Sequence, residues 1–267
     1  MTTHDKIEAR AKRGQIPAGF EKKFEAQTQK DLILLLAHED AQIRTAAAIL
    51  LGQQKCVDAV SELCHQFSKE TTLYSRIAQS KALGEIGLPA LPHLINLIGK
   101  IGHNQHHALP ENLFRKWNYP IPRDIAARTI VKMGPAALPI LLKTLEEQSD
   151  PMICAECIDA VGYINYYSKD YQGFQTLKML WKKYDNHLVI QWKLIRALQA
   201  FPQPDSIELL KEIILTSPIP QHRWEAVRSL GQTGTHQAKD ILQSIENEGH
   251  PLVQEMIQRS LDHLENH

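Results

Sequence analysis

The sequence has few aromatic residues, few cysteines and no net charge. Aromatic residues make up 6% of its 267 residues, whereas hydrophobic residues together make up 43%. This balance favours stacked helices rich in Leu, Ile and Ala over a β-sandwich. Four cysteines are too few for a disulfide framework. Thirty basic and thirty acidic residues cancel, so no global field draws the chain to nucleic acid or to a membrane.

Long apolar runs are also missing. Residues 1–30 are polar and charged, without the apolar stretch of a signal peptide. No run approaches the roughly 18 apolar residues that a membrane-spanning helix needs. Together with the few cysteines, these features predict a cytoplasmic protein with reduced thiols and no membrane partner.

A short pattern, ideally Ala-x-x-Ala-Leu-Gly, recurs along the chain. Gly52 and Gly84 end two copies and lie 32 residues apart. The copies occupy 48–52, 80–84, 127–131 (a weaker copy), 158–162, 195–199, 227–231 and 258–262. Self-similarity at this period is typical of a solenoid. The sequence therefore predicts an all-α, right-handed α-solenoid of about seven helix pairs over residues 28–264, capped by a polar N-terminal extension, 1–27.

Apolar residues around each copy follow the 3.6-residue period of a helix with one buried face. The pattern ends the second helix of each pair, and we refer to its Gly position as the Gly column. Second helices are expected at 40–52, 72–87, 122–134, 151–166, 187–200, 220–232 and 251–264. First helices are expected at 28–37, 57–67, 89–101, 135–147, 171–184, 205–215 and 235–246. Asp150, Asp205 and Thr235 are candidate N-caps, and small residues in the Gly column permit close helix packing.

Two units carry a family resemblance. One begins at Glu39-Asp40 and ends at Gly52, and the other begins at Asp150-Pro151 and ends at Gly162. The run Gly87-Leu-Pro-Ala-Leu-Pro92 is echoed by Gly134-Pro-Ala-Ala-Leu-Pro139. The chain resembles HEAT-like repeat proteins of the short-unit kind found in phycobilin lyase subunits. The resemblance implies the fold and adds a chromophore lyase or chaperone to the candidate functions.

Four arginines occupy one column of the repeats, eight residues before the Gly column. They are Arg44, Arg76, Arg123 and Arg223. In HEAT-like proteins such arginines usually tie neighbouring turns together, and the resemblance implies that role here.

One interval is longer than the others because it contains an insertion, 102–122. Its prolines and histidines argue against a helix, and long irregular segments in compact folds are often functional. The aromatic and basic side chains in it are candidate partner-binding residues: Phe114, Arg115, Lys116, Trp117 and Tyr119. The aromatic side chains among them need an apolar surface to pack against, either on this chain or on a partner. His103, His106 and His107 lack metal-ligand spacing and are expected to be solvated.

The stripe of the second helices that leads to the Gly column forms the expected concave face of the solenoid. Candidate partner-binding residues on it are Lys81, Arg128, Asp159, Trp192, Arg196, Trp224, Arg228 and Arg259. Each tryptophan precedes an arginine by four residues, so Arg196 and Arg228 can stack on Trp192 and Trp224. The tryptophans are expected to be partly exposed.

Two repeat enzymes offer comparisons with this stripe. Alkylated-DNA glycosylases with HEAT-like repeats use a basic face, tryptophans and an Asp; Asp159 has similar surroundings, although the aromatic motif before that Asp is missing. Deoxyhypusine hydroxylase binds metal through His-Glu dipeptides, and here Ala155-Glu156 and Trp224-Glu225 keep only the glutamates. We therefore predict no catalytic residues, no metal and no cofactor.

The most consistent interpretation is a non-catalytic scaffold that binds a protein partner on its concave face. The basic residues of the stripe are too sparse along the solenoid to follow a duplex, which offers one charge per about 1.7 Å. A nucleic-acid binder or glycosylase-like enzyme is the first alternative, and a chromophore lyase or chaperone is the second.

Overall fold

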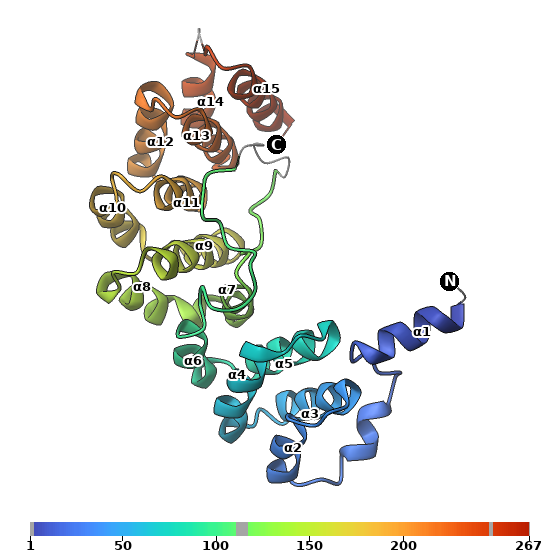
Figure 1. The fold of residues 1–267 in the computed structure, drawn as a ribbon. Helices are drawn as coiled ribbons and strands as arrows, with labels where there is room; N and C mark the ends of the chain where they lie inside the picture. Colours follow the sequence, from blue (N-terminus) through green and yellow to red (C-terminus); the bar gives the residue numbers. More distant parts are fainter. Residues whose placement is uncertain (1–2, 111–116, 246–247, 267) are drawn as a thin grey trace. The chain divides into compact units, whose positions relative to one another are not determined.

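The computed structural model describes residues 3–110, 117–245 and 248–266, and within these ranges it contains helices and no strand. The prediction of an all-α chain is confirmed. The chain divides into two compact units. Unit 1 comprises Met1–His103 and Asp124–Ala137, and unit 2 comprises Asn104–Arg123 and Leu138–His267 (Figure 1).

Unit 1 contains an N-terminal segment followed by three helix pairs. The segment holds α1 (Thr3–Lys12) and the 3-10 helix η1 (Phe20–Phe24). The pairs are α2 (Gln29–Leu35) with α3 (Ala41–Gln53), α4 (Val60–Lys69) with α5 (Leu73–Ile86), and α6 (Leu91–Ile95) with α7 (Ile125–Ile130). Three further 3-10 turns are η2 (Val57–Ala59), η3 (Leu88–Ala90) and η4 (Val131–Ala137).

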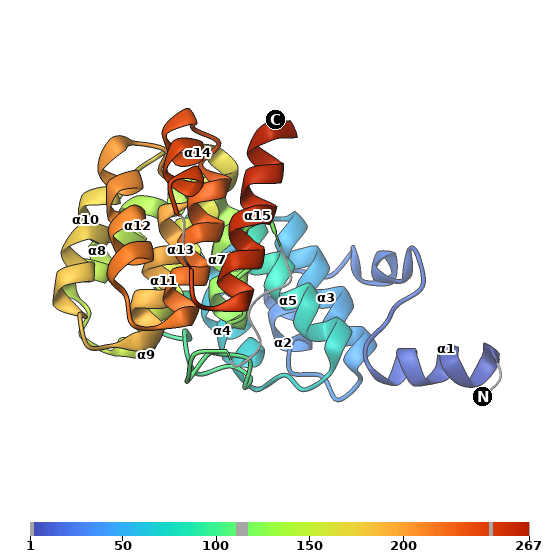
Figure 2. The same ribbon diagram turned by 90° about the horizontal axis from the view of Figure 1, so that it is seen from above.

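Unit 2 contains four helix pairs. They are α8 (Leu138–Glu147) with α9 (Pro151–Ser168), α10 (Phe174–Lys183) with α11 (Leu188–Leu198), α12 (Pro204–Thr216) with α13 (Pro220–Gln232), and α14 (His236–Gln243) with α15 (Pro251–Asn266). The second helices α9, α11, α13 and α15 pack successively on one another. Figures 1 and 2 show α8, α10 and α12 in one layer of this unit and α9, α11 and α13 in the other.

The predicted helix pairs all occur in the described residues, with three local differences. The second helix expected over 122–134 is reduced to α7, which the 3-10 helix η4 follows. The first helix expected over 89–101 is reduced to α6, which ends at Ile95 and is followed by turns that include Gly99 at a positive φ of 77°. Asp205 was predicted to be an N-cap, but α12 begins at Pro204, which places Asp205 in its first turn. Asp150 and Thr235 do cap α9 and α14.

The segment from α7 to α8, Ile125–Glu147, has the length and the apolar composition of a membrane-spanning helix. In the fold it is not one straight helix. Gly134, at φ 64° and ψ −153°, interrupts it, and the side chains of Leu138, Leu141 and Leu145 are fully buried in unit 2. Core helices of globular folds pass the same test of composition.

Two glycines of the Gly column lie where successive second helices come close together. A Cβ atom on Gly52 would lie 2.7 Å from Cα of Ala82, and one on Gly231 would lie 2.7 Å from Cβ of Ser260. Real Cβ contacts essentially never come this close. A small residue at these positions therefore permits close helix packing, as the sequence predicted.

Two arginines of the shared column tie consecutive turns together. Arg44 on α3 donates to both carboxylate oxygens of Glu70, at 2.8 and 3.0 Å, and to the carbonyl of His38. Arg223 on α13 makes the same fork with Glu248, at 3.0 and 2.8 Å. Each glutamate follows the first helix of the next pair. The structural role implied by the family resemblance is thus confirmed at these two positions.

Glu70 is the centre of the first of these clamps. Burial raises the pKa of Glu70, but hydrogen bonds from Arg44, Ser75 and Thr72 outweigh it and lower the pKa to about 2. Because the pKa of Glu70 is lower in the folded state than in the unfolded state, its carboxylate stabilises the fold. This contribution is complete above the unfolded-state pKa of 4.5 and is lost as the pH falls towards 2.

We expect Glu70→Gln to lower the free energy of unfolding at pH 7 by on the order of 3 kcal/mol. The deficit should shrink between pH 4.5 and about 2, because the wild-type carboxylate becomes protonated there. Urea denaturation across this range measures it. Glu25→Gln, at an exposed position, is the matched control and should change stability little. A deficit of equal size at pH 2 and pH 7 would contradict the clamp as its cause.

Candidate functional site

The second helices of unit 2 carry six buried charged side chains. Each of three successive helices contributes two of them, three residues apart. They are Glu156 and Asp159 on α9, Lys193 and Arg196 on α11, and Glu225 and Arg228 on α13. All are at most 3% exposed. Because residues three apart share a helix face, the six side chains form a row across the three helices, which we call the charge row.

Within the charge row every cation faces a carboxylate. Lys193 Nζ lies 2.5 Å from Oε1 of Glu156 and 3.0 Å from Oδ2 of Asp159. Arg196 Nη1 lies 3.3 Å from Oδ1 of Asp159. Arg228 donates to Oε1 of Glu225 through Nε at 2.9 Å and through Nη2 at 2.5 Å. The row contains three cations and three carboxylates, so its charges balance.

Trp192 lies inside the charge row and links two of its helices. Its indole Nε1 donates to Oε2 of Glu225 at 2.9 Å, and the guanidinium carbon of Arg196 lies 3.9 Å from its ring centroid. The predicted stacking of Arg196 on Trp192 is therefore confirmed. Arg228 does not repeat this arrangement with Trp224, since its guanidinium is turned to Glu225.

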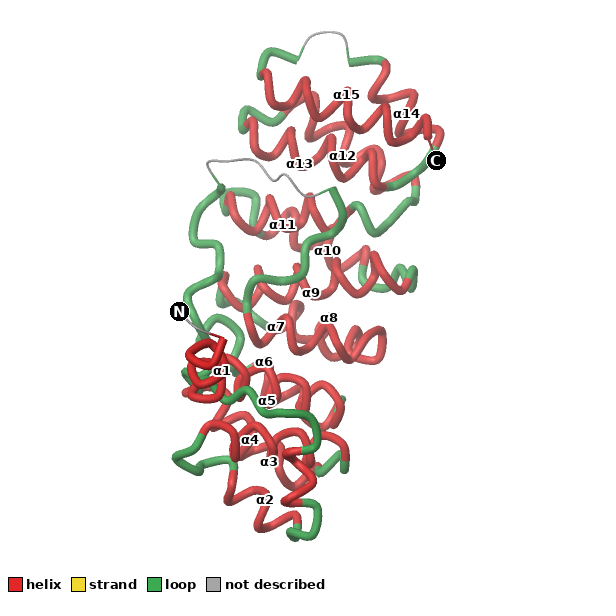
Figure 3. The backbone as a smooth tube through the Cα atoms, turned by 90° about the vertical axis from the view of Figure 1, so that its right-hand side faces the viewer, coloured by secondary structure: helices red, strands yellow, loops and turns green. Residues whose placement is uncertain are grey.

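We call the surface formed by the second helices α9, α11, α13 and α15 the wall of unit 2. The insertion lies over this wall, and we call its described residues in unit 2, 104–110 and 117–123, the strap. They contain no helix, as predicted. The strap runs along the second-helix side of α9 and α11 (Figure 3). The ring of His106 meets Trp192 edge-on with centroids 4.9 Å apart. The carbonyl of Trp117 accepts a hydrogen bond from Arg228 Nη1 at 2.7 Å.

Two aromatic side chains anchor the second half of the strap. Tyr119 is 2% exposed, and its hydroxyl lies against Gly162 of α9, where a Cβ atom would overlap it. Trp117 reaches α15, where its ring meets His263 with centroids 4.8 Å apart and lies 5.3 Å from the guanidinium carbon of Arg259. The strap therefore contacts all four second helices of unit 2.

The prediction that the tryptophans are partly exposed is wrong. Trp192 is 0% exposed and Trp224 4% exposed, and Asp159, Arg196 and Arg228 are buried with them. The helices place these residues on the predicted stripe, but the strap and the opposite charges cover them. His106, expected in a solvated loop, is buried as well; His103 and His107 are exposed.

The remaining predicted residues have different surroundings. Lys81 on α5 and Arg259 on α15 are exposed, and Arg128 on α7 is half-buried. Phe114, Arg115 and Lys116 lie outside the described residues. The predicted partner-binding role of these residues stays a prediction.

Electrostatics in the covered wall follow from burial and from neighbouring charge. Burial raises the pKa of Asp159, but Lys193 and Arg196 outweigh it and hold that pKa below its ordinary value. Burial, followed by the positive charges of Lys193 and Arg196, lowers the pKa of His106 to about 3. His106 is therefore neutral at pH 7, and its Nε2 lies 3.1 Å from the Arg123 guanidinium as an acceptor.

Sequence reasoning missed Glu156, Lys193 and Glu225 as members of the charge row. They share one column, six residues before the Gly column, and the charge sign alternates from α9 to α11 to α13. Asp159, Arg196 and Arg228 occupy the column three residues later. The two columns taken together could have indicated pairing between helices rather than an exposed stripe.

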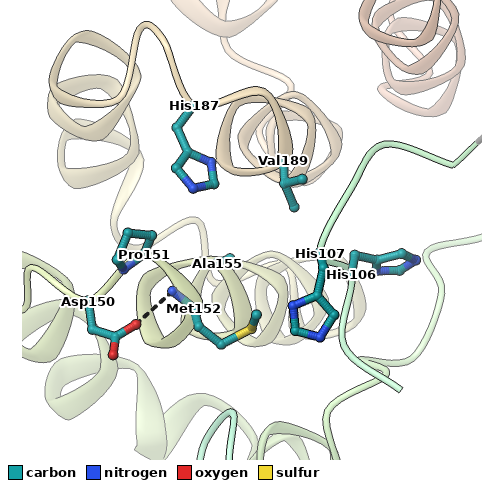
Figure 4. A pocket seen from close by; sticks show the side chains of 8 residues that line it. All are labelled: His106, His107, Asp150, Pro151, Met152, Ala155, His187 and Val189. Carbon is teal, nitrogen blue, oxygen red and sulfur yellow. Dashed lines mark hydrogen bonds between the residues drawn. The ribbon is translucent and has the colours of Figure 1, made fainter. Parts of the chain in front are cut away.

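A cavity of about 300 Å³ lies beside the strap in unit 2 (Figure 4). Its lining residues are His106, His107, Asp150, Pro151, Met152, Ala155, His187 and Val189. Asp150 Oδ1 accepts from the backbone N–H of Met152 at 2.8 Å, and His187 Nδ1 accepts from that of Ile190 at 3.3 Å. Both side chains cap helices, so they are already engaged in the fold.

No group of three or more His, Cys, Asp or Glu side chains in the described part of the chain is placed to hold a metal ion. The glutamates at the two positions compared with metal-binding His-Glu dipeptides, Glu156 and Glu225, instead face Lys193 and Arg228. The donor set of this wall therefore suits ion pairing within the protein.

Comparisons with known proteins concern the fold. Residues 177–262 match the family model of HEAT repeats. A search of curated proteins finds no match. Human deoxyhypusine hydroxylase in complex with glycerol is 14% identical, with 99% of this chain and 98% of that chain covered and a TM-score of 0.40. The CpcE–CpcF complex of phycocyanin lyase from a Nostoc species is 18% identical, with 89% and 94% covered and a TM-score of 0.35.

Neither structural likeness bears on activity at these identities and TM-scores. The family match and the stacked helix pairs agree with the fold that the repeat pattern predicted. The chain therefore has an all-α solenoid fold, and its residues 177–262 are similar to HEAT repeats.

Proposed function

We propose that the chain is a non-catalytic repeat scaffold that binds a protein partner on the wall formed by its second helices. The observation that carries this proposal is the strap. An irregular stretch of polypeptide already lies on the wall of unit 2 and contacts residues of α9, α11, α13 and α15.

The contacts with the strap are those by which proteins recognise extended peptides. Arg228 binds a backbone carbonyl of the strap, Gly162 leaves a notch for an aromatic side chain, and Trp192 offers an apolar face. Main-chain hydrogen bonds supply affinity in such recognition, and side-chain pockets supply specificity. The repeat wall is thus suited to a polypeptide ligand.

The corresponding wall of unit 1 is the surface formed by its second helices α3, α5 and α7, and it carries exposed aliphatic side chains. Leu73 and Ile77 lie one turn apart on α5 and are 42% and 52% exposed. Adjacent exposed aliphatic side chains on one helix face are a feature of protein-interaction sites. The residues equivalent to Ile77 on α9, α11 and α13 are Ala155, Trp192 and Trp224, and all three are buried. Ile77 is therefore an exposed point of the unit 1 wall where a partner can bind.

The nucleic-acid alternative depended on an exposed stripe of Trp and Arg. On α9, α11 and α13 that stripe is buried, and its cations face carboxylates. Such a wall has no excess charge with which to neutralise phosphates. The chromophore-lyase alternative depends on the family resemblance alone.

Site-specific photo-crosslinking in cells tests the proposal. A photoreactive phenylalanine analogue at Ile77 is expected to give one discrete, saturable protein adduct that unlabelled wild-type chain competes away. The same analogue at Leu34, which is 74% exposed on the first helix α2, is the control and should give none. No adduct from Ile77, or equal labelling from Leu34, would remove the support for a partner on this wall.

A further inference from the structure

A group of three tyrosines lies at the C-terminal end of α9. Tyr163, Tyr166 and Tyr167 are spaced three and four residues from the first of them, so they share one face of that helix. The ring centroids of Tyr163 and Tyr167 are 4.6 Å apart, and those of Tyr166 and Tyr167 are 5.0 Å apart. We call these three side chains the tyrosine face. It follows the charge-row residues of α9 along the wall of unit 2.

The tyrosine face is partly exposed while the strap is in place. Tyr167 is 54% exposed, and Tyr163 is half-buried. In the strap, Ile121 is 43% exposed and Pro120 is half-buried. The hydroxyl of Tyr167 donates to the carbonyl of Tyr119 at 3.2 Å, which places it next to this part of the strap. Aromatic rings and aliphatic side chains therefore form one exposed apolar surface, a feature of interaction sites.

The strap itself shows which kind of ligand the tyrosine face accepts. Its residues 119–122, Tyr-Pro-Ile-Pro, form no helix, strand, turn or bend. Each proline fixes its own φ at about −65° and keeps the residue before it extended, so the run suits a polyproline II conformation. The ring of Tyr119 meets those of Tyr163 and Tyr166 with centroids 6.1 and 5.7 Å away. Grooves lined by aromatic side chains are the usual binding sites of polyproline II segments.

Tyr163 supplies a second hydroxyl group for such a ligand. Its hydroxyl makes no hydrogen bond within the described part of the chain, whereas that of Tyr166 donates to Oε1 of Gln232 at 2.6 Å. A polyproline II segment has no internal hydrogen bonds, so its carbonyls need donors from elsewhere. Tyr167 already donates to a carbonyl of the strap in this way, and Tyr163 can do the same for a second segment.

We propose that the tyrosine face binds a proline-rich segment of a protein partner, which lies beside the strap. Prolyl rings of the segment pack against the ring of Tyr167 and against Ile121, and a carbonyl accepts from the hydroxyl of Tyr163. The inference rests on the proposed function, because it gives a partner of the scaffold a chemistry and a site on the wall of unit 2. Such a segment is already extended, so it loses little conformational freedom on binding.

Nucleic acid is the other class of ligand that uses aromatic side chains, since bases stack on exposed ring faces. Here the rings stand at steep angles to one another. Tyr166 and Tyr167 meet at 86°, and Tyr119 and Tyr163 meet at 88°. Rings arranged in this way present edges and slots instead of flat platforms, which suits the small ring of proline better than a base.

Fluorescence anisotropy with three defined probes tests the inference on the full chain. The probes are a labelled peptide of Pro-Pro-Leu-Pro repeats, the same peptide with every Pro replaced by Ala, and a single-stranded oligothymidylate. The proline peptide is expected to bind, and the other two probes should bind at least about tenfold more weakly. In Tyr167→Ala the affinity for the proline peptide should fall at least about tenfold, as for a tyrosine at the centre of an interface.

Three further variants separate the ring, the hydroxyl and general effects. Tyr167→Phe keeps the ring and should retain most of the affinity. Tyr163→Phe loses the proposed donor and should bind about three- to tenfold more weakly, the effect of one hydrogen bond. Met179→Ala truncates a side chain that is 56% exposed on the first helix α10; it is the matched control and should leave binding unchanged. If iodide quenching shows that Tyr167→Ala has uncovered Trp192, Tyr163→Phe decides the test.

The inference is overturned if the proline peptide does not bind, or if Tyr167→Ala and Tyr163→Phe bind it as the wild type does. It is also overturned if the alanine peptide binds equally well, which would assign the face to a helical segment, or if the oligonucleotide binds most tightly. A cross-linked protein adduct at Ile77, found while the proline peptide fails to bind, would keep the scaffold proposal and reject a proline-rich partner.

Discussion

Replacing Lys193 by Met is expected to lower the free energy of unfolding by about 3–5 kcal/mol, a loss typical of breaking a buried ion pair by removing one member. Lys193 is 0% exposed and faces Glu156 at 2.5 Å and Asp159 at 3.0 Å. The substitution preserves much of the side-chain volume. It leaves Glu156 without this cation in a site that water does not reach.

Urea denaturation measures the loss, and two controls assign its cause. Lys178→Met removes an ion pair with Asp205 whose side chains are 43% and 59% exposed, so it should cost less than about 1 kcal/mol. In Lys193→Met/Glu156→Leu the whole pair becomes apolar, and most of the stability should return. A double variant no better than Lys193→Met would show that lost packing, and not a buried charge, is responsible.

The second large effect is expected at Gly162. A Val side chain there would overlap the hydroxyl of Tyr119, and its Cβ would lie 2.9 Å from Cβ of Ala197 on α11. Overpacking of this kind costs about 1–3 kcal/mol. Because Tyr119 anchors the strap, we also expect the strap to leave the wall and expose Trp192.

Three measurements follow the strap in Gly162→Val. Stability should fall, limited proteolysis should cut within residues 104–123, and iodide should quench indole fluorescence more than in the wild type, in which Trp192 and Trp224 are buried. Tyr119→Phe is the matched control. The Tyr119 hydroxyl finds no hydrogen-bond partner among the described residues, so its removal should change stability by less than about 1 kcal/mol.

The pairing of Gly162 with Tyr119 can be isolated by a double-mutant cycle. Gly162→Ala alone should be destabilising, and Gly162→Ala/Tyr119→Phe should recover part of the loss because the oxygen nearest the new methyl group is gone. Additive effects in this cycle, together with an unchanged proteolysis pattern in Gly162→Val, would mean that Tyr119 does not hold the strap.

The helix pairs could be predicted from the sequence because they depend on patterns of neighbouring residues. Each second helix shows its buried stripe within a few turns, and glycines such as Gly52 and Gly231 mark where the next helix comes close. The clamp at Arg44 was also foreseeable, since its column recurs at Arg223. Positions on a helix face follow from the 3.6-residue period alone.

The solvent exposure of these side chains could not be predicted from the sequence, because it depends on which other segments cover the helix face. The stripe holds Trp192 and Arg196 as predicted, yet both are buried, since the strap lies over them. The strap contacts residues that follow it by more than a hundred positions, as Trp117 does with Arg228, and no local pattern encodes such a contact.

The sequence by itself determined the repeat, the helix pairs and the residues of each helix face, because these follow from short-range periodicity. Only the tertiary structure decided which part of the wall is open. In unit 2 the folded insertion and the balanced charge row of Glu156, Lys193 and their neighbours close the wall. In unit 1 the wall around Ile77 and Lys81 stays exposed. Burial depends on long-range packing, which the order of residues along one helix does not record.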